Sequence, residues 1–262
     1  MTTEEAAFDL PHFSTDLGGS VALVTGATAG LGWRFAQVLA SSGAAVAAVG
    51  RRAHRLEALA AAISGAGGTC LPLPLDIAEP AGLAPALDQI ETTLGPVSIL
   101  VNNAAIPDAQ YATKMSLDLI DRVIATNLRA PFLLSAEVAR RPMARGAPGR
   151  IVNVSSMGAH HYRGGASSLY STTKAAVERM TETLAVEWAP FHINVNAIAP
   201  GAFATEMLEG MIERVGGLSD SFARQRLGHP AQLDSTLLYL VSPSSEFVTG
   251  TIVKVDDGQN PR

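Results

Sequence analysis

The sequence predicts an α/β protein built on one open, parallel, doubly wound β-sheet of about seven strands, with helices on both faces. Short apolar runs alternate with helix-forming stretches over almost the whole chain, which indicates parallel strands joined by helical crossovers. The runs do not alternate polar and apolar residues, as is typical of strands covered on both faces. With 262 residues, 47% of them hydrophobic, the chain can fill one large core. We expect a loose N-terminal arm over residues 1–18 and a single domain over residues 19–262.

The predicted elements follow one another in a regular order. A strand over Val21–Val24 leads through a glycine-rich turn into a helix containing Trp33–Leu39, which Gly43 ends as a C-terminal cap. A second strand over Ala44–Val49 precedes a helix over Arg51–Ile63, whose apolar residues recur at helical spacing. Further strands are expected at Cys70–Leu75, Val97–Val101, Ile151–Val154, Ile193–Ile198 and Thr251–Val255.

Charge and composition exclude several classes of function. The net charge is -5 and the chain has no basic run, which disfavours binding of nucleic acid. Cys70 is the only cysteine, so we expect no internal disulfide, no multi-cysteine metal site and a reducing, cytoplasmic location. The acidic start of the chain lacks the features of a secretory signal. No apolar stretch approaches the ~20 residues that a membrane helix needs, so we expect a soluble protein.

The turn after the first strand carries three glycines, Gly26, Gly30 and Gly32. Glycine lets the backbone turn tightly and approach a pyrophosphate, and the amides at the N-terminus of the following helix attract the anion. The spacing Gly-x-x-x-Gly-x-Gly differs from the usual dinucleotide pattern. A loop that binds no ligand is the alternative.

Tyr170 and Lys174 are four residues apart in a helix-forming stretch and therefore share one face of the helix. A free tyrosine has a pKa of ~10 and is a poor acid or base at neutral pH. A neighbouring positive charge favours the phenolate and lowers that pKa, which suits proton transfer to or from an alcohol or carbonyl oxygen. Taken alone the pattern is weak, and an exposed tyrosine beside a solvated lysine would also fit it.

Together with further motifs in the same order, these residues resemble the short-chain dehydrogenase/reductase family from about Ser20 to Gln259. The motifs are Thr25–Gly32, Asn102–Ala105 with alanine in place of the last glycine, Asn127, Ser155–Ser156, Tyr170 with Lys174, and Pro200–Gly201 followed by Thr205. The resemblance implies a single-domain Rossmann fold. It also implies hydride transfer between a nicotinamide cofactor and a carbonyl or alcohol.

The resemblance implies four catalytic residues. Ser156 would hydrogen-bond the substrate oxygen, and Tyr170 would exchange the proton. Lys174 would lower the pKa of Tyr170 and hold the nicotinamide ribose. Asn127 would support a water chain, although an asparagine near a helix can also satisfy a backbone group. Ser156 lies fourteen residues before Tyr170, one more than in many relatives, so Ser155 is the alternative serine.

NADP(H) is favoured over NAD(H) by the residues that follow the second strand. Gly50 stands where NAD-preferring relatives carry aspartate, and Arg51 and Arg52 can offer bidentate donors to a 2′-phosphate. Alternatively, both arginines face water. The cofactor-binding residues implied by the resemblance are Gly26, Thr28, Ala29, Gly30, Leu31, Gly32, Arg51, Arg52, Asp76, Ile77, Asn103, Ala104, Ala105, Tyr170, Lys174, Pro200, Gly201, Phe203 and Thr205.

The substrate side is expected to combine a polar loop with an apolar lid. His160, His161 and Tyr162 would line the mouth of the site, and no further ligands accompany the histidines to favour a metal. Residues 203–226 would form the lid. Met207 and Met211 would face either a partly apolar substrate or the core.

We therefore expect an NADP(H)-dependent carbonyl reductase or alcohol dehydrogenase. The alternatives are an NAD-dependent secondary alcohol, sugar or steroid dehydrogenase and, in another class, a nucleotide-binding regulatory protein without turnover. Relatives pair long crossover helices, so a homotetramer or homodimer is expected. The small residues Ala175, Ala176 and Ala185 in the helix after Tyr170 are compatible with such pairing.

Overall fold

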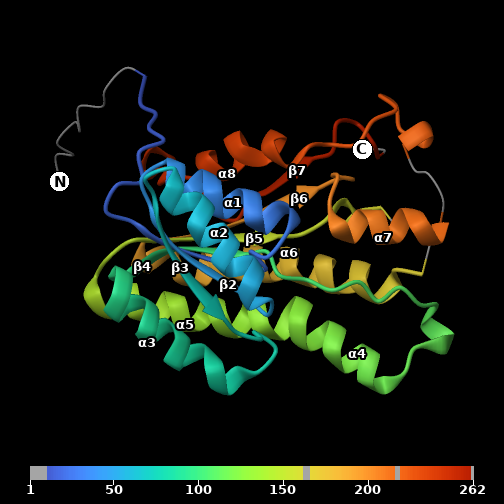
Figure 1. Ribbon diagram of the computed structural model, residues 1–262, viewed down its shortest axis with the longest axis horizontal. Coiled ribbons are helices and arrows are strands. Elements are labelled where there is room, and N and C mark those ends of the chain that lie inside the picture. The colour runs from blue at the N-terminus through green and yellow to red at the C-terminus, as the bar shows by residue number, and fades with distance from the viewer. Residues whose placement is uncertain (1–10, 162–165, 216–218, 261–262) are drawn as a thin grey trace.

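Seven parallel strands form one sheet in the computed structural model, which describes residues 11–161, 166–215 and 219–260 (Figure 1). The strand order is β3-β2-β1-β4-β5-β6-β7, and every neighbouring pair is parallel. The strands are β1 (Val21–Thr25), β2 (Ala45–Gly50), β3 (Thr69–Pro74), β4 (Val97–Asn102), β5 (Gly149–Val154), β6 (Ile193–Pro200) and β7 (Ile252–Val255). Each predicted strand lies within two residues of an observed one, so the predicted α/β fold is confirmed.

Helices cover both faces of the sheet, as expected for a doubly wound fold. They are α1 (Gly30–Ser41), α2 (Ala53–Gly65), α3 (Leu83–Leu94), α4 (Leu117–Ile124), α5 (Ala130–Arg145), α6 (Ser168–Trp188), α7 (Glu206–Val215) and α8 (Asp234–Val241). One buried cluster joins α1, α2 and α8 to the sheet, and a second joins α3, α5 and α6 to its other face. A π-helical turn at Ala125–Arg129 connects α4 to α5.

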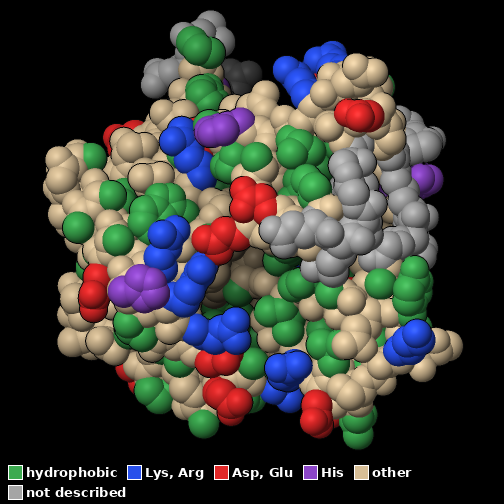
Figure 2. Space-filling view, turned by 45° about the vertical axis from the view of Figure 1, so that its right-hand side comes forward, with side chains coloured by type: hydrophobic (Ala, Val, Ile, Leu, Met, Phe, Trp, Pro, Cys, Tyr) green, Lys and Arg blue, Asp and Glu red, His purple; other side chains and the backbone are tan. Residues whose placement is uncertain are grey.

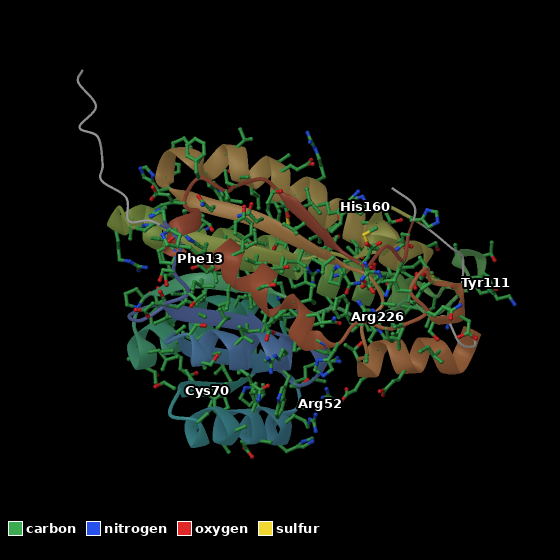
Figure 3. All side chains as sticks on the ribbon, turned by 90° about the horizontal axis from the view of Figure 1, so that it is seen from above. Phe13, Arg52, Cys70, Tyr111, His160 and Arg226 are labelled. Atoms are coloured by element: carbon green, nitrogen blue, oxygen red, sulfur yellow. The ribbon has the colours of Figure 1, made fainter. Side chains whose placement is uncertain are left out.

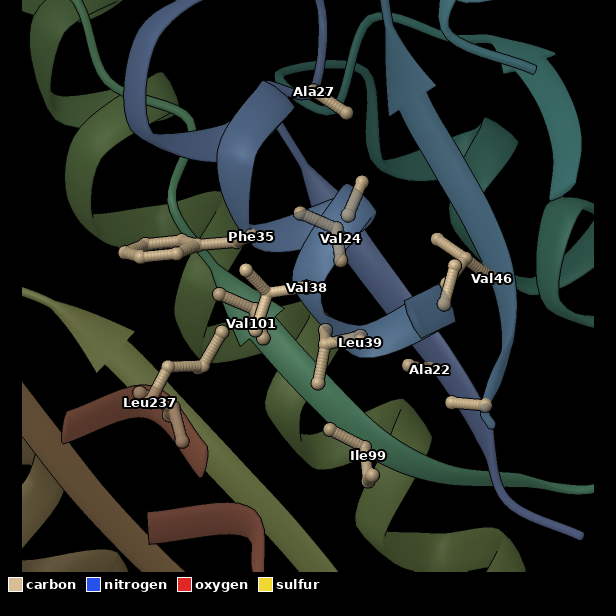
Figure 4. Packing of buried hydrophobic residues seen from close by; sticks show 14 of the residues in the cluster. Ala22, Val24, Ala27, Phe35, Val38, Leu39, Val46, Ile99, Val101 and Leu237 are labelled. Atoms are coloured by element: carbon tan, nitrogen blue, oxygen red, sulfur yellow. The ribbon is translucent and has the colours of Figure 1, made fainter. Parts of the chain in front are cut away.

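The central strand β1 is buried on both faces of the sheet, which is why its sequence is an unbroken apolar run. Ala22 and Val24 belong to the cluster under α1, whereas Val21 and Leu23 belong to the cluster under α3 and α5. All four are almost fully buried, since both faces of the strand are covered. Figure 4 shows Ala22 and Val24 beside the side chains of α1, with Phe35 completely buried.

Two local features follow directly from residue chemistry. Gly43 follows α1 with a φ of 98°, in the left-handed region that favours glycine, so the predicted helix end is confirmed. Strand β3 contains Pro72 and Pro74, which lack a backbone N–H, and it occupies an edge of the sheet where this loss is tolerated.

The strand order creates a crevice beside β1. Strand β1 pairs with β2 on one side and with β4 on the other, so the connections leave it in opposite directions. At such a reversal the loops after the strands separate, and the carboxyl edge of an α/β sheet binds ligands there.

Along the described residues, no helix has both the length and the hydropathy needed to cross a membrane.

Candidate active site

A cavity of about 650 Å³ opens at the carboxyl edge of the sheet. The loops after β1, β2, β4, β5 and β6 contribute to its lining, together with the start of α6 and part of α7. Figure 2 shows the surface hollowed here, with charged side chains on one side of the opening and apolar ones on the other. Residues far apart in the sequence therefore meet in one cleft.

Thr25 and Asn103 fasten the glycine loop to the loop after β4. The Thr25 hydroxyl accepts hydrogen bonds from the backbone N–H groups of Asn103 (3.0 Å) and Ala104 (3.1 Å). The Asn103 side chain donates to the Thr25 carbonyl at 3.0 Å. Gly26 has a φ of 67°, and a Cβ there would lie 2.8 Å from the backbone of Ala104. The two loops are thus held at a separation that only glycine permits.

The N-terminus of α1 is chemically suited to an anion. Its N-cap, Ala29, makes no side-chain hydrogen bond to the helix, and the first turn carries no acidic residue. A Cβ on Gly32 would overlap the Gly26 carbonyl, so the loop is tightly packed beneath this helix end. Unblocked amides and the helix dipole favour phosphate groups, so the cradle fits the diphosphate of a dinucleotide.

Two arginines lie at the end of β2, where the ribose of a dinucleotide would be bound. Arg51 is largely exposed, and its nearest ion-pair partner among the described residues is Asp76 at 4.0 Å. Arg52 is more firmly held, donating to the Thr28 hydroxyl from Nε (3.2 Å) and Nη2 (2.9 Å). Arg52 also pairs with Glu206 at 3.1 Å. This end of the cavity therefore offers cationic donors and a neighbouring carboxylate.

Tyr170, Ser156 and Lys174 meet at the other end of the cavity. Tyr170 lies in the first turn of α6, Ser156 follows β5 by two residues, and both line the cavity. Lys174 is one turn further along α6, with Nζ 5.7 Å from the centre of the Tyr170 ring. Its ammonium donates to the carbonyl of Val154 at 2.6 Å. The structure therefore brings these three predicted residues together at one end of the cavity.

Burial shifts the pKa values of the tyrosine and the lysine in opposite directions. It raises the pKa of Tyr170, an effect that the hydrogen bond with Ser156 offsets in part and the charge of Asp108 increases. It also lowers the pKa of Lys174 to about 8. In this chain, burial of the phenol therefore outweighs the lowering of the Tyr170 pKa that was expected from Lys174.

The neighbouring serine, Ser155, has a different set of partners. Its hydroxyl lies 2.7 Å from Oε1 of Glu178, to which it donates, and 3.2 Å from the Lys174 carbonyl. The same Glu178 oxygen lies 3.0 Å from Nε2 of His160. Because Ser156 is the serine that reaches Tyr170, the geometry favours it over the alternative Ser155.

Asn127 lies in the π-helical turn, next to the cavity but outside its lining. It accepts a hydrogen bond from the Ile106 backbone N–H at 2.9 Å, and its Nδ2 donates to the Ile106 carbonyl at 2.9 Å. A third bond runs to the Thr173 hydroxyl at 3.3 Å. Asn127 thus links the loop after β4 to α6.

Asp108 is a buried carboxylate that the sequence analysis missed. It is 2% exposed and lines the cavity. Its Oδ2 accepts the backbone N–H groups of Leu169 (2.8 Å) and Tyr170 (3.1 Å), while Oδ1 accepts that of Ala109 (2.8 Å). Asp108 therefore caps α6, whose own N-cap Ser167 makes no side-chain cap. No signal in the sequence joins Asp108 to a helix that begins about sixty residues later.

Most of the predicted site residues line the cavity. They are Gly26, Thr28, Ala29, Gly30, Leu31, Arg51, Arg52, Asp76, Ile77, Asn103, Ala104, Ala105, Ser156, His161, Tyr170, Lys174, Pro200, Gly201, Phe203, Thr205 and Met207.

Three predicted residues lie outside the lining. Gly32 and Asn127 pack behind it. His160 was predicted to line the substrate pocket and does not, because its imidazole is turned toward Glu178. Figure 3 shows His160 well away from Arg52, on the α6 side of the structure. Tyr162 and the side chain of Met211 fall outside the described residues.

Comparison with known proteins places the chain in a family. The short chain dehydrogenase model matches residues 20–215. The chain is 36% identical over 249 residues to the short-chain reductase protein NovJ of Streptomyces niveus, covering 92% of this chain and 94% of that one. It is 34% identical to gluconate 5-dehydrogenase of Gluconobacter oxydans, covering 92% and 95%. The protein belongs to the short-chain dehydrogenase/reductase family and is an oxidoreductase.

Solved structures agree with this assignment. A short-chain type dehydrogenase/reductase from Mycobacterium marinum superposes with a TM-score of 0.91 at 35% identity, covering 95% of this chain and 98% of that one. A structure from Beutenbergia cavernae, described as a putative NAD(P)-dependent gluconate 5-dehydrogenase with NADP bound at low occupancy, gives a TM-score of 0.86 at 31% identity. It covers 94% of this chain and 98% of that one.

Proposed function

We propose that the protein interconverts a ketone or aldehyde and the corresponding alcohol, with NADP(H) as cofactor and Tyr170 as the general acid and base. The observation that carries the proposal is that Ser156, Tyr170 and the buried Lys174 line the same end of one cavity. Such a group of donors matches the charge that grows on a carbonyl oxygen during reduction.

Each residue has a defined part in this reaction. When bound, a reduced nicotinamide cofactor would supply the hydride for the carbonyl carbon. The Tyr170 hydroxyl donates its proton to the carbonyl oxygen, so one hydride and one proton together complete the alcohol. The Ser156 hydroxyl donates a hydrogen bond to the same oxygen and stabilises its developing charge. Lys174 provides the adjacent positive charge that favours the tyrosinate left behind.

The preference for NADP(H) rests on the end of β2. Gly50 brings no carboxylate to the ribose, and Arg51 presents a largely exposed guanidinium to the cavity. A guanidinium forms strong charge-assisted bonds with phosphate. The Beutenbergia cavernae structure described with NADP bound supports the same cofactor.

For the substrate, the lining combines polar groups near Tyr170 with an apolar side. Met207, Leu208 and Phe222 contribute to that side. We propose a substrate with one carbonyl and a partly apolar body. A sugar-acid or polyol substrate is the second candidate, because the similar Gluconobacter oxydans protein is a gluconate 5-dehydrogenase. Residues 203–226 would act as the lid, and a homotetramer or homodimer in the cytoplasm is the expected assembly.

The test is turnover with purified protein. NADPH and a panel of apolar ketones and keto-sugar acids are mixed with the enzyme, and the absorbance of the reduced nicotinamide is followed. We expect oxidation of NADPH with at least one carbonyl compound and slower oxidation of NADH. Tight cofactor binding without turnover of any carbonyl or alcohol would instead favour the regulatory alternative.

A further inference from the structure

The two arginines after β2 differ in how many of their guanidinium N–H groups already bind other residues of the chain. The Arg51 side chain is 69% exposed, and its only ion pair among the described residues is the 4.0 Å approach to Asp76. Arg52 donates on one side to Thr28, at 2.9 and 3.2 Å, and on the other to Glu206, at 3.1 Å. Two edges of the planar Arg52 guanidinium are therefore already hydrogen-bonded, one to Thr28 and the other to Glu206.

Glu206 reaches Arg52 from the other side of the cavity. It is the first residue of α7, 154 positions along the chain from Arg52. Its second oxygen lies 3.9 Å from Arg55, a residue of α2 that donates to the Thr28 carbonyl at 3.1 Å. Both Arg52 and Glu206 line the cavity. Figure 2 shows acidic side chains meeting basic ones at the edge of the hollow.

This arrangement opposes the 2′-phosphate of NADP in two ways. A phosphate that uses Arg52 has to displace a carboxylate from it. A carboxylate that stays in place repels the doubly charged phosphate beside it. Neither effect acts on NAD, because its 2′-hydroxyl is uncharged and can itself donate a hydrogen bond to a carboxylate.

We propose that Glu206 is a specificity-determining residue, which binds Arg52 and so selectively weakens the binding of the 2′-phosphate of NADP. Arg51 remains the arginine available to that phosphate. The inference rests on the proposed cofactor site at the end of β2. The side chains of Arg52 and Glu206 are 44% and 53% exposed, so solvent and salt moderate the effect. A change of about two- to fivefold in affinity is the scale expected for one such pair.

The test is a calorimetric titration of NADP⁺ and NAD⁺ into the protein and its Glu206→Gln variant. Glu206→Gln is expected to tighten the binding of NADP⁺ about two- to fivefold and to leave that of NAD⁺ nearly unchanged. Glu209→Gln is the matched control, because it removes the same charge from an exposed position one turn along α7. It is expected to change neither affinity appreciably.

A second pair of variants separates competition from a general loss of negative charge. In an Arg52→Gln background, the further change Glu206→Gln is expected to raise the NADP⁺ affinity little, because the guanidinium that Glu206 binds is already absent. An equal gain in both backgrounds, or an unchanged or weakened NADP⁺ affinity in Glu206→Gln, would overturn the inference. Wild-type protein that binds NAD⁺ more tightly than NADP⁺ would contradict the proposed cofactor preference instead. The ratio of the two NADP⁺ affinities would still decide the role of Glu206.

Discussion

Tyr170 and Lys174 share one face of α6, and burial acts on both. It makes Tyr170 a weaker acid and the Lys174 ammonium a stronger one. Burial disfavours the charged form of each group, so it raises the pKa of Tyr170 and lowers that of Lys174 to about 8. At neutral pH the phenol is therefore protonated and most of the lysine is charged. A protonated tyrosine is ready to donate a proton, which suits reduction of a carbonyl. In the oxidising direction, the positive charge of the oxidised nicotinamide would add to that of Lys174 and favour the tyrosinate.

Replacing Tyr170 by Phe tests the role of the hydroxyl alone. The ring that borders the cavity is kept, so cofactor affinity should stay within about twofold, whereas kcat should fall by roughly 10² to 10⁴ through loss of general acid catalysis. Steady-state kinetics and a cofactor titration measure the two effects. Tyr111→Phe is the control, since Tyr111 is 64% exposed and lies outside the cavity lining. Undiminished kcat in Tyr170→Phe would remove the tyrosine from the mechanism.

The buried ammonium of Lys174 should change how the free energy of unfolding depends on pH. The unfolded chain holds this proton up to a pH near 10.5, but the native protein holds it only up to about 8. Between these values the unfolded state binds more protons, so this residue makes the free energy of unfolding rise with pH. In Lys174→Met that contribution disappears, and the rise between pH 8 and 10 should be smaller by about 2 to 3 kcal/mol.

Urea unfolding of both proteins at pH 8 and pH 10 measures this difference. Other lysines and tyrosines titrate in both proteins and cancel in the comparison. Met also leaves the carbonyl of Val154 without its 2.6 Å donor, but that loss does not vary with pH. Equal pH dependence in the two proteins would show that the ammonium is not buried in the native state.

At the scale of elements, the sequence predicted what local patterns determine and missed what distant contacts determine. Seven strands were located because parallel strands buried on both faces read as apolar runs. Tyr170 and Lys174 were found because their spacing is local, and Ser156 was found through the resemblance to a family motif. The cap that Asp108 provides spans 62 positions to Tyr170, and the Arg52–Glu206 pair spans 154. No periodicity reports contacts at such separations.

Asp108 makes the position of α6 depend on a loop that follows β4. In Asp108→Ala, the N–H groups of Leu169 and Tyr170 lose their buried acceptor, and the free energy of unfolding should fall by about 1 to 2 kcal/mol. Asp108→Asn keeps one acceptor oxygen and should lose less than half as much. Chemical denaturation at pH 7 measures both, and equal losses in the two variants would show that the carboxylate does not act as a cap.

At the scale of the molecule, the fold and its functional edge followed from the order of elements, whereas the balance of charges at the cavity mouth did not. The reversal at β1 brings the glycine loop, the end of β2 and the start of α6 to one edge. Their residue types could then be interpreted from sequence. Arg51 and Arg52 looked equivalent in the sequence, but the fold gives Arg52 a carboxylate partner and leaves Arg51 more open. Partners of this kind are set by tertiary packing.

The proposed assembly depends on the outer face of the helix layer that contains α5 and α6. Phe132 on α5 is 48% exposed and Val186 on α6 is 78% exposed, although both helices bury their inner faces in the same cluster. Pairing two copies through this face would remove that apolar surface from water. Phe132→Glu would place a charge in such an interface, so the molar mass measured by light scattering should fall to that of a smaller assembly. Phe13→Glu introduces the same charge at a residue that is 57% exposed in the N-terminal segment, and its mass should match the wild type. If Phe132→Glu also kept the wild-type mass, the copies would have to associate through another face, because an unpaired glutamate is not tolerated in the centre of an apolar interface.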